Sequence, residues 1–172
     1  MPARLLGLLL LAAPAAFGQT SDLSYESYID SDKRIKCLYG YAAQKTGDHA
    51  AALKIFVDCV DRWDDVYSMI WLAQMYESGV GVPRSLEKAA ALMKRGAEQP
   101  DTAAYVSLAR YHWGVALAEG RGVAMDKHAA RHWLQRASES GQTEADDYLR
   151  RLDHPPRASI AERSDNNNET DP

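Results

Sequence analysis

Apolar residues recur three and four positions apart through most of the chain, and this pattern itself repeats. Residues 77–82 (ESGVGV) align with residues 118–123 (AEGRGV) at an offset of 41 positions, and Met93 aligns with Leu134 at the same offset. A spacing of three and four is typical of amphipathic helices. Self-similarity at this period indicates stacked helical hairpins, each of which buries its apolar face against a neighbour.

An earlier unit with a shorter turn occupies residues 33–62. Gly40 in its first helix corresponds to Ala73, and Phe56 in its second helix corresponds to Met93. The two offsets, 33 and 37, differ by four residues, which are inserted in the later turn while both helices keep their register.

The pattern predicts three antiparallel hairpins and a capping helix. The predicted helices span residues 32–45, 48–62, 65–77, 85–97, 102–118, 126–139 and 142–152. They form units at about 33–62, 65–97 and 102–140 within a repeat domain at 32–152. Asp48, Ser85 and Asp126 stand where a side-chain oxygen would cap the second helix of each hairpin.

Both ends of the chain differ from this pattern. Residues 1–18 combine Arg4, a short apolar run and small residues before Gln19, which predicts a cleaved signal peptide and a periplasmic location. The alternative is an uncleaved membrane anchor, but the run is shorter than the ~20 residues that a span needs. Residues 19–31 are polar and acidic with a few tyrosines and are predicted to be a short lead-in. Residues 153–172 are predicted to be a disordered tail, because they contain too little apolar surface to fold.

Three segments carry a resemblance to known helical repeats. Residues 72–98 (LAQMYESGVGVPRSLEKAAALMKRGAE) and 113–138 (WGVALAEGRGVAMDKHAARHWLQRAS) resemble Sel1-like repeats, and residues 39–59 (YGYAAQKTGDHAAALKIFVDC) resemble a tetratricopeptide repeat. The resemblance implies an all-α fold, a right-handed superhelix of stacked antiparallel helical hairpins, whose first helices line a concave groove. Proteins of this kind bind other proteins and carry no catalytic machinery. Exported bacterial members include envelope-assembly scaffolds and immunity proteins.

The resemblance also assigns contact positions to the first helix of each unit. The groove-facing positions of the family fall on Arg34, Tyr41, Gln44 and Lys45, then on Tyr67, Ile70, Gln74 and Glu77, and finally on Leu108, Tyr111, Val115 and Glu119. A surface rich in tyrosine with mixed charges suits protein recognition. The alternative is that several of these tyrosines pack between neighbouring helices.

The turns of the second and third units each contain a pair of glycines. Gly79 and Gly120 are expected to end the preceding helix in the left-handed conformation, which only glycine adopts without strain. Gly81 and Gly122 then let the chain reverse, so that the following valine can pack into the hairpin.

The two cysteines lie in different helices of the first predicted hairpin. Cys37 precedes the turn at Gly47 by ten residues and Cys59 follows it by twelve, so that the side chains are expected to face each other. In an oxidising compartment this geometry favours a structural disulfide. The alternative, a reactive thiol pair, lacks the CxxC spacing.

Charge and motifs narrow the chemistry. A formal net charge of -4 argues against a nucleic-acid partner, since that would need a basic face. His128 and His132 share one face of a predicted helix and could bind Zn²⁺, but a site needs further ligands, and the alternative is an ordinary outer face. No catalytic motif is present, so neither an enzyme nor a metal or other cofactor is expected.

The sequence therefore predicts a periplasmic module that binds another protein, without a stable membrane anchor after signal cleavage. One interpretation is an immunity protein that neutralises a toxic effector such as a lipase. The alternative interpretations are an envelope-assembly scaffold and an enzyme that uses the groove to bind a ligand.

Overall fold

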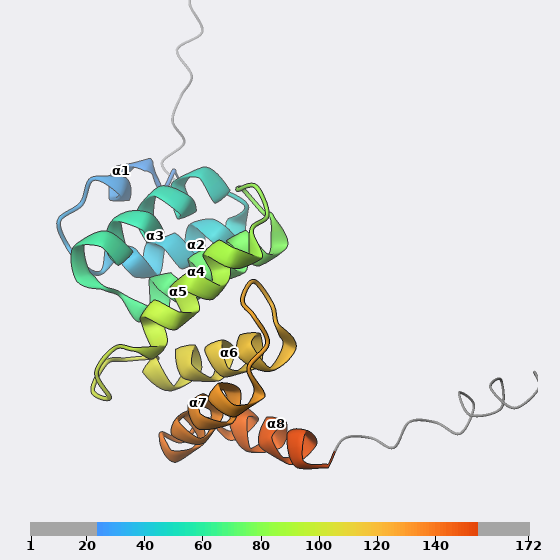
Figure 1. Ribbon diagram of the computed structural model, residues 1–172. Coiled ribbons are helices and arrows are strands. Elements are labelled where there is room, and N and C mark those ends of the chain that lie inside the picture. The colour runs from blue at the N-terminus through green and yellow to red at the C-terminus, as the bar shows by residue number, and fades with distance from the viewer. Residues whose placement is uncertain (1–23, 155–172) are drawn as a thin grey trace, which may run out of the picture.

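The computed structural model describes residues 24–154, and its regular elements are helices arranged as stacked hairpins (Figure 1). A short α1 (Glu26–Ile29) precedes the stack, and α8 (Thr143–Asp153) ends it. The hairpins are α2 (Lys36–Thr46) with α3 (His49–Trp63), α4 (Val66–Ser78) with α5 (Leu86–Ala97), and α6 (Val106–Glu119) with α7 (Lys127–Glu139). The predicted all-α solenoid is therefore confirmed.

The predicted signal peptide at 1–18 lies outside the described residues, as do residues 155–172 of the predicted tail. Between residues 24 and 154, none of the helices is both long enough and apolar enough to cross a membrane.

The apolar core consists of layers between successive units. Phe56 of the first hairpin packs with Met69 and Met75 of the second. Met93 of the second hairpin packs in turn with Trp113 of the third. Because each layer is shared by two neighbours, no hairpin buries its apolar face alone, and the units stabilise one another.

Side-chain caps fix where the second helix of each hairpin begins. Asp48 accepts a hydrogen bond from the Ala51 amide at 3.1 Å. Ser85 accepts one from the Lys88 amide at 3.2 Å, and Asp126 does the same for the Ala129 amide at 2.9 Å. Each cap satisfies an amide that has no partner within its own helix.

The two long turns close in the same way, 41 residues apart. The Ser85 amide donates to the Tyr76 carbonyl at 2.9 Å, and the Asp126 amide donates to the Leu117 carbonyl at 2.9 Å. Gly122 has a φ of +68°, and a Cβ there would lie only 2.0 Å from the Leu86 carbonyl oxygen. The third turn therefore packs directly on the start of α5, where only a residue without a side chain fits.

One predicted boundary is wrong. The helix expected from residue 102 begins at Val106, and residues 101–105 form turns instead. The Ala103 amide donates to the Pro100 carbonyl, and Tyr105 takes a left-handed φ of +63°. Residues 98–105, which we call the linker, therefore cross from α5 to α6 without continuing either helix.

The later part of the predicted acidic lead-in at 19–31 contains α1, which packs on the first hairpin. Lys36 is fully buried and donates to the Ile29 carbonyl at 2.8 Å, while its ammonium pairs with the Asp58 carboxylate at 2.5 Å. Burial alone would raise the pKa of Asp58, but the hydrogen bond and charge of Lys36, together with Arg62, lower it below its usual range. These contacts hold the polar segment that contains α1 against the first hairpin.

The predicted disulfide joins Cys37 of α2 to Cys59 of α3, with the Cα atoms 6.0 Å apart. Tyr25, Tyr28 and Trp63 pack around the pair. The bond therefore ties the two helices of the first hairpin together beneath α1.

We expect Gly122→Ala to destabilise the fold far more than Gly141→Ala. Both glycines have positive φ, but a Cβ at Gly141 would meet nothing within 4 Å. The control should lose only ~1 kcal/mol of unfolding free energy from backbone strain, whereas Gly122→Ala should lose at least ~3 kcal/mol because the turn must also move. Urea unfolding of both variants tests this, and equal losses would show that the turn does not pack on α5.

We expect the double substitution Cys37→Ala and Cys59→Ala to lower the free energy of unfolding by about 3 kcal/mol. The bond closes a separation of 22 residues, and opening it restores freedom to the unfolded chain. The measurement is urea unfolding under oxidising conditions. Reductant should destabilise the wild type by a similar amount and leave the double variant unchanged; a wild type that is insensitive to reductant would contradict the expectation.

Candidate functional site

The first helices of the first two hairpins present matching stripes to one side of the molecule. Positions 34, 38, 41 and 45 form the stripe that leads into and along α2, and positions 67, 71, 74 and 78 form the stripe of α4. Residues spaced by three and four lie on one face of a helix, so the two stripes run side by side. We call the surface between them, together with its two hollows, the groove.

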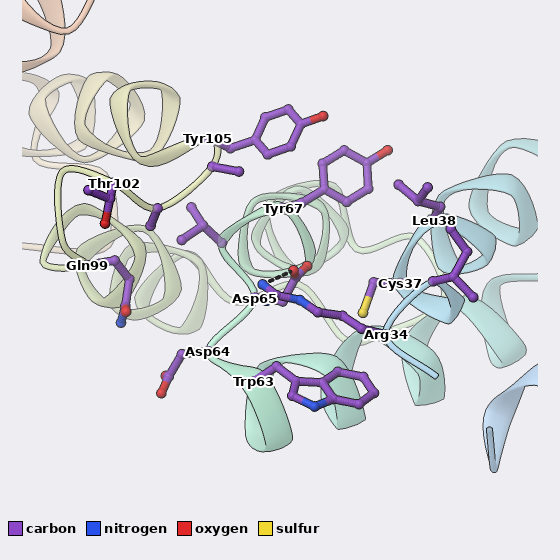
Figure 2. Close-up of a pocket in the computed structure, with 14 residues that line it drawn as sticks. Arg34, Cys37, Leu38, Trp63, Asp64, Asp65, Tyr67, Gln99, Thr102 and Tyr105 are labelled. Atoms are coloured by element: carbon purple, nitrogen blue, oxygen red, sulfur yellow. Dashed lines mark hydrogen bonds and ion pairs between the residues drawn. The ribbon is translucent and has the colours of Figure 1, made fainter. Parts of the chain in front are cut away.

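The linker-side hollow lies at the start of α2 and α4 and has a volume of about 620 Å³ (Figure 2). Its rim is apolar: Ile35 is 54% exposed, Leu38 52% and Tyr105 50%. Figure 2 shows the rings of Tyr67 and Tyr105 side by side above the hollow, with their centroids 5.0 Å apart. Large apolar side chains that stay this exposed around one cavity mark a contact surface.

An ion pair lies between the two helices inside this hollow. The Arg34 guanidinium reaches Asp65 at 3.0 Å (Figure 2). Asp65 also accepts from the Ser68 amide at 3.0 Å and the Ser68 hydroxyl at 2.8 Å. Asp65 is thus both the cap of α4 and the partner of a cation from the preceding unit. The pair aligns the start of α4 with the start of α2.

The turn-side hollow lies at the other end of the same two helices and has a volume of about 510 Å³. It is lined by Gln44, Lys45, Trp71, Gln74, Glu77 and Ser78. Its lining is polar except for the indole ring, so that it can exchange hydrogen bonds with a bound group.

Aromatic rings connect the two hollows. Tyr41 lies 4.7 Å from Trp71 and 6.1 Å from Tyr67, measured between ring centroids, and Tyr67 lies 6.1 Å from Trp71. Tyr105 extends this series through Tyr67. Edge-to-face and tilted contacts of this kind hold the rings in fixed positions. Burial raises the pKa of Tyr67 above its ordinary value, so its hydroxyl stays neutral and can donate a hydrogen bond.

Tyr105 is held in place by the linker, which a buried arginine fixes. Arg110 is 2% exposed, and its guanidinium donates to the Ala97 carbonyl at 3.2 Å and the Gln99 carbonyl at 3.3 Å. The same side chain forms an ion pair with Asp101. The guanidinium therefore binds the end of α5 and the linker at once, which sets the position of Tyr105 at the start of α6.

The negative charge of Asp101 contributes to holding the linker, through its ion pairs with Arg110 and Arg136. The hydrogen bond and the charge of Arg110, together with Arg136 at 3.0 Å, hold the pKa of Asp101 below its usual range. A lowered pKa means that the folded state favours the carboxylate. This contribution is therefore present at neutral pH and is lost only as the pH falls through the lowered pKa.

The structure brings most of the predicted contact residues of the first two units to this groove. Arg34, Tyr41, Gln44, Lys45, Tyr67, Gln74 and Glu77 line it or form its floor. Ile70 does not: it is 3% exposed and belongs to the core between the second and third hairpins. It faces inward because α4 packs on α6 along that side, so a partner cannot reach its side chain.

The predicted contact residues of the third unit are partly covered from within the chain: Val115 is buried, Leu108 and Tyr111 are half-buried, and Glu119 stays exposed. Tyr111 packs against Tyr148 of α8 with ring centroids 6.5 Å apart, and Val115 is 6% exposed in the same cluster. The Tyr148 hydroxyl donates to Glu119 at 2.9 Å, and burial together with this hydrogen bond raises the pKa of Tyr148 to about 12. Leu108 packs on the core beneath. Since α8 covers part of this surface, the two connected hollows are formed by α2, α4 and the linker.

Several groove residues were not predicted. Leu38 and Trp71 belong to the same helical stripes as the predicted residues, so a count of three and four from Tyr41 and Tyr67 would have found them. Ile35 and Tyr105 lie outside the helical pattern of the repeat. Their exposure depends on how the linker is folded, which no local pattern specifies.

The described residues offer little for metal chemistry. Within residues 24–154, no group of three or more His, Cys, Asp or Glu side chains is arranged to hold a metal ion. His128 and His132 both lie exposed on α7, and the His132 ring packs against Trp133 at 5.7 Å. The residues of the groove are suited to binding through aromatic contact and charge.

Comparison with known families identifies repeats in the later part of the chain. The family model of the Sel1 repeat matches residues 66–101 and residues 107–142, which contain the second and third hairpins. Among curated proteins, no match to this chain is found. Sel1 repeats generally mediate binding to other proteins and are typically not enzymatic.

We expect Arg110→Met to loosen the linker and to lower the free energy of unfolding by ~3 kcal/mol. The substitution leaves two buried carbonyl groups without their charged donor. Hydrogen exchange of the amides of residues 98–105 should accelerate. The control Arg131→Met removes an exposed pair with Asp153 and should cost less than ~1 kcal/mol. Unchanged linker exchange in Arg110→Met would contradict the assigned role.

Proposed function

We propose that this chain, whose residues 66–101 and 107–142 are two Sel1 repeats, is an exported module that binds another protein in the groove between α2 and α4. The observation that carries the proposal is the set of connected rings of Tyr41, Tyr67 and Trp71 between the two hollows, which Tyr105 extends. We call these three rings the aromatic floor. Tyrosine and tryptophan supply large contact area with few rotatable bonds, and they dominate the energetics of protein interfaces.

The shape of the groove favours a segment of a partner over a small molecule. The two hollows have volumes of about 620 and 510 Å³ and lie at opposite ends of the same pair of helices. An extended or loop segment can place side chains in both at once. Backbone groups of such a segment can exchange hydrogen bonds with Gln44 and Gln74, whose amides both donate and accept.

The compartment and the biological role belong to the same proposal. The Cys37–Cys59 disulfide supports an oxidising environment, which agrees with export to the periplasm. For the role we propose an immunity protein that neutralises a toxic effector, for example a lipase, by binding a segment of the effector in this groove. The alternative role is an envelope-assembly scaffold that holds a resident envelope protein.

The test is to capture partners from periplasmic extract with the disulfide-bonded protein and to identify them. The captured partner is then produced in the periplasm with and without this chain. Growth that is lost with the partner alone and restored by coproduction supports immunity. A captured envelope protein that does not impair growth replaces immunity with the scaffold role. Capture that survives loss of the aromatic floor contradicts the groove itself.

We expect Tyr67→Ala and Trp71→Ala each to weaken binding of the captured partner by at least ~2 kcal/mol, or about 30-fold in Kd, because both rings form the centre of the floor. The matched control is Val57→Ala on α3, a residue that is 38% exposed outside the groove. Isothermal titration calorimetry gives the Kd, and circular dichroism confirms that each variant is folded. Full affinity in both aromatic variants would move the interface elsewhere.

A further inference from the structure

The groove contains a cation whose charge no described carboxylate balances. The Lys45 ammonium lies 5.4 Å from the centroid of the Tyr41 ring and 4.9 Å from that of Trp71. Within residues 24–154, no carboxylate lies within the 4.0 Å of an ion pair with it. Cation–π contact with two rings holds the ammonium at one place on the groove surface while leaving it accessible.

The carboxylates that line the groove are already engaged. Asp65 pairs with Arg34, and Asp64 pairs with Arg95 at 2.6 Å. Glu77 shares the turn-side hollow with Lys45, but its carboxylate faces Arg121 of the next turn at 3.7 Å. Lys45 is therefore the position in the groove where a negative charge from a partner gains most.

The linker-side hollow, at the other end of the groove, is suited to binding an apolar group. Ile35, Leu38 and Tyr105 are each about half exposed around the linker-side hollow, beside Tyr67. Covering these side chains removes apolar surface from water, which is the main source of affinity at protein interfaces. The opposite ends of the groove thus differ in the chemistry they select.

The α2 helix fixes the distance between the apolar position at Leu38 and the cationic position at Lys45. Leu38 and Lys45 are seven residues apart on the same face of α2. At the rise of a helix this separation is ~10 Å. An extended chain advances about 3.3 Å per residue, and its successive side chains point to opposite faces. Two side chains that both enter the groove are therefore two or four residues apart, at ~7 or ~13 Å, which brackets this separation.

We propose that the groove binds an extended segment of another protein in which an apolar side chain and an acidic side chain lie on the same face, two or four residues apart. The apolar side chain occupies the linker-side hollow against Leu38, Tyr67 and Tyr105. The carboxylate pairs with the ammonium of Lys45 on the aromatic floor. This inference rests on the proposed function, since it names the kind of segment that the same groove holds.

The test uses a displayed library of random eight-residue peptides, selected on the disulfide-bonded protein. Enriched peptides should carry an apolar and an acidic residue at a separation of two or four. Fluorescence anisotropy then gives the Kd of one enriched peptide and of its variant in which the acidic residue is replaced by its amide. The amide peptide should bind about tenfold more weakly.

Variants of the protein are then measured against the same two peptides. Lys45→Gln should weaken the acidic peptide about tenfold and leave the amide peptide unchanged, whereas Lys45→Arg should keep the preference. Lys54→Gln, on the exposed side of α3, is the matched control and should change neither Kd. Leu38→Ala should weaken both peptides equally.

The outcomes separate this inference from the proposed function. Peptides that Tyr67→Ala releases, but that show no acidic preference at this spacing or no response to Lys45→Gln, overturn the inference and leave the groove as the binding site. A selection that enriches no peptide, or only peptides insensitive to Tyr67→Ala, overturns both.

Discussion

The buried guanidinium of Arg110 is the contact on which the shape of the binding surface depends. It donates hydrogen bonds to the end of α5 and to the linker, and its ion pair with Asp101 adds a third contact that holds the linker in place. A buried charge is costly unless its donors are matched, so the linker has few alternative paths once Arg110 is in place. The left-handed backbone of Tyr105, and with it one wall of the groove, follows from this constraint.

The two ends of the stack explain why the groove is short. At one end, Lys36 holds α1 over the disulfide of the first hairpin, and the Leu38 position of the α2 stripe stays half exposed. At the other end, α8 takes the place that the first helix of a fourth unit would have, and Tyr148 closes over Tyr111. A terminal repeat must hide its apolar face from water, and α8 therefore covers part of the surface that the third unit would add to the groove.

The repeat pattern predicted those features that depend on residues close together in the sequence. Helix boundaries followed from capping residues such as Asp126, and the disulfide followed from two cysteines that face each other across one turn. The start of α6, the fold of α1 and the burial of Ile70 could not be predicted, because each depends on a partner distant in sequence. For the same reason the packing of α8 against the contact positions of the third unit could not be predicted.

Recognition by this groove must work against the charge of the whole chain. The formal net charge is -4, so an acidic partner is repelled at long range. At physiological ionic strength that repulsion is screened beyond ~8 Å, whereas Lys45 acts in direct contact on an aromatic surface of lower polarity. A segment with a single acidic residue beside an apolar anchor gains the local contact and meets little of the long-range penalty. A strongly acidic segment meets the full penalty, which makes the groove selective for sparse charge in a fixed register.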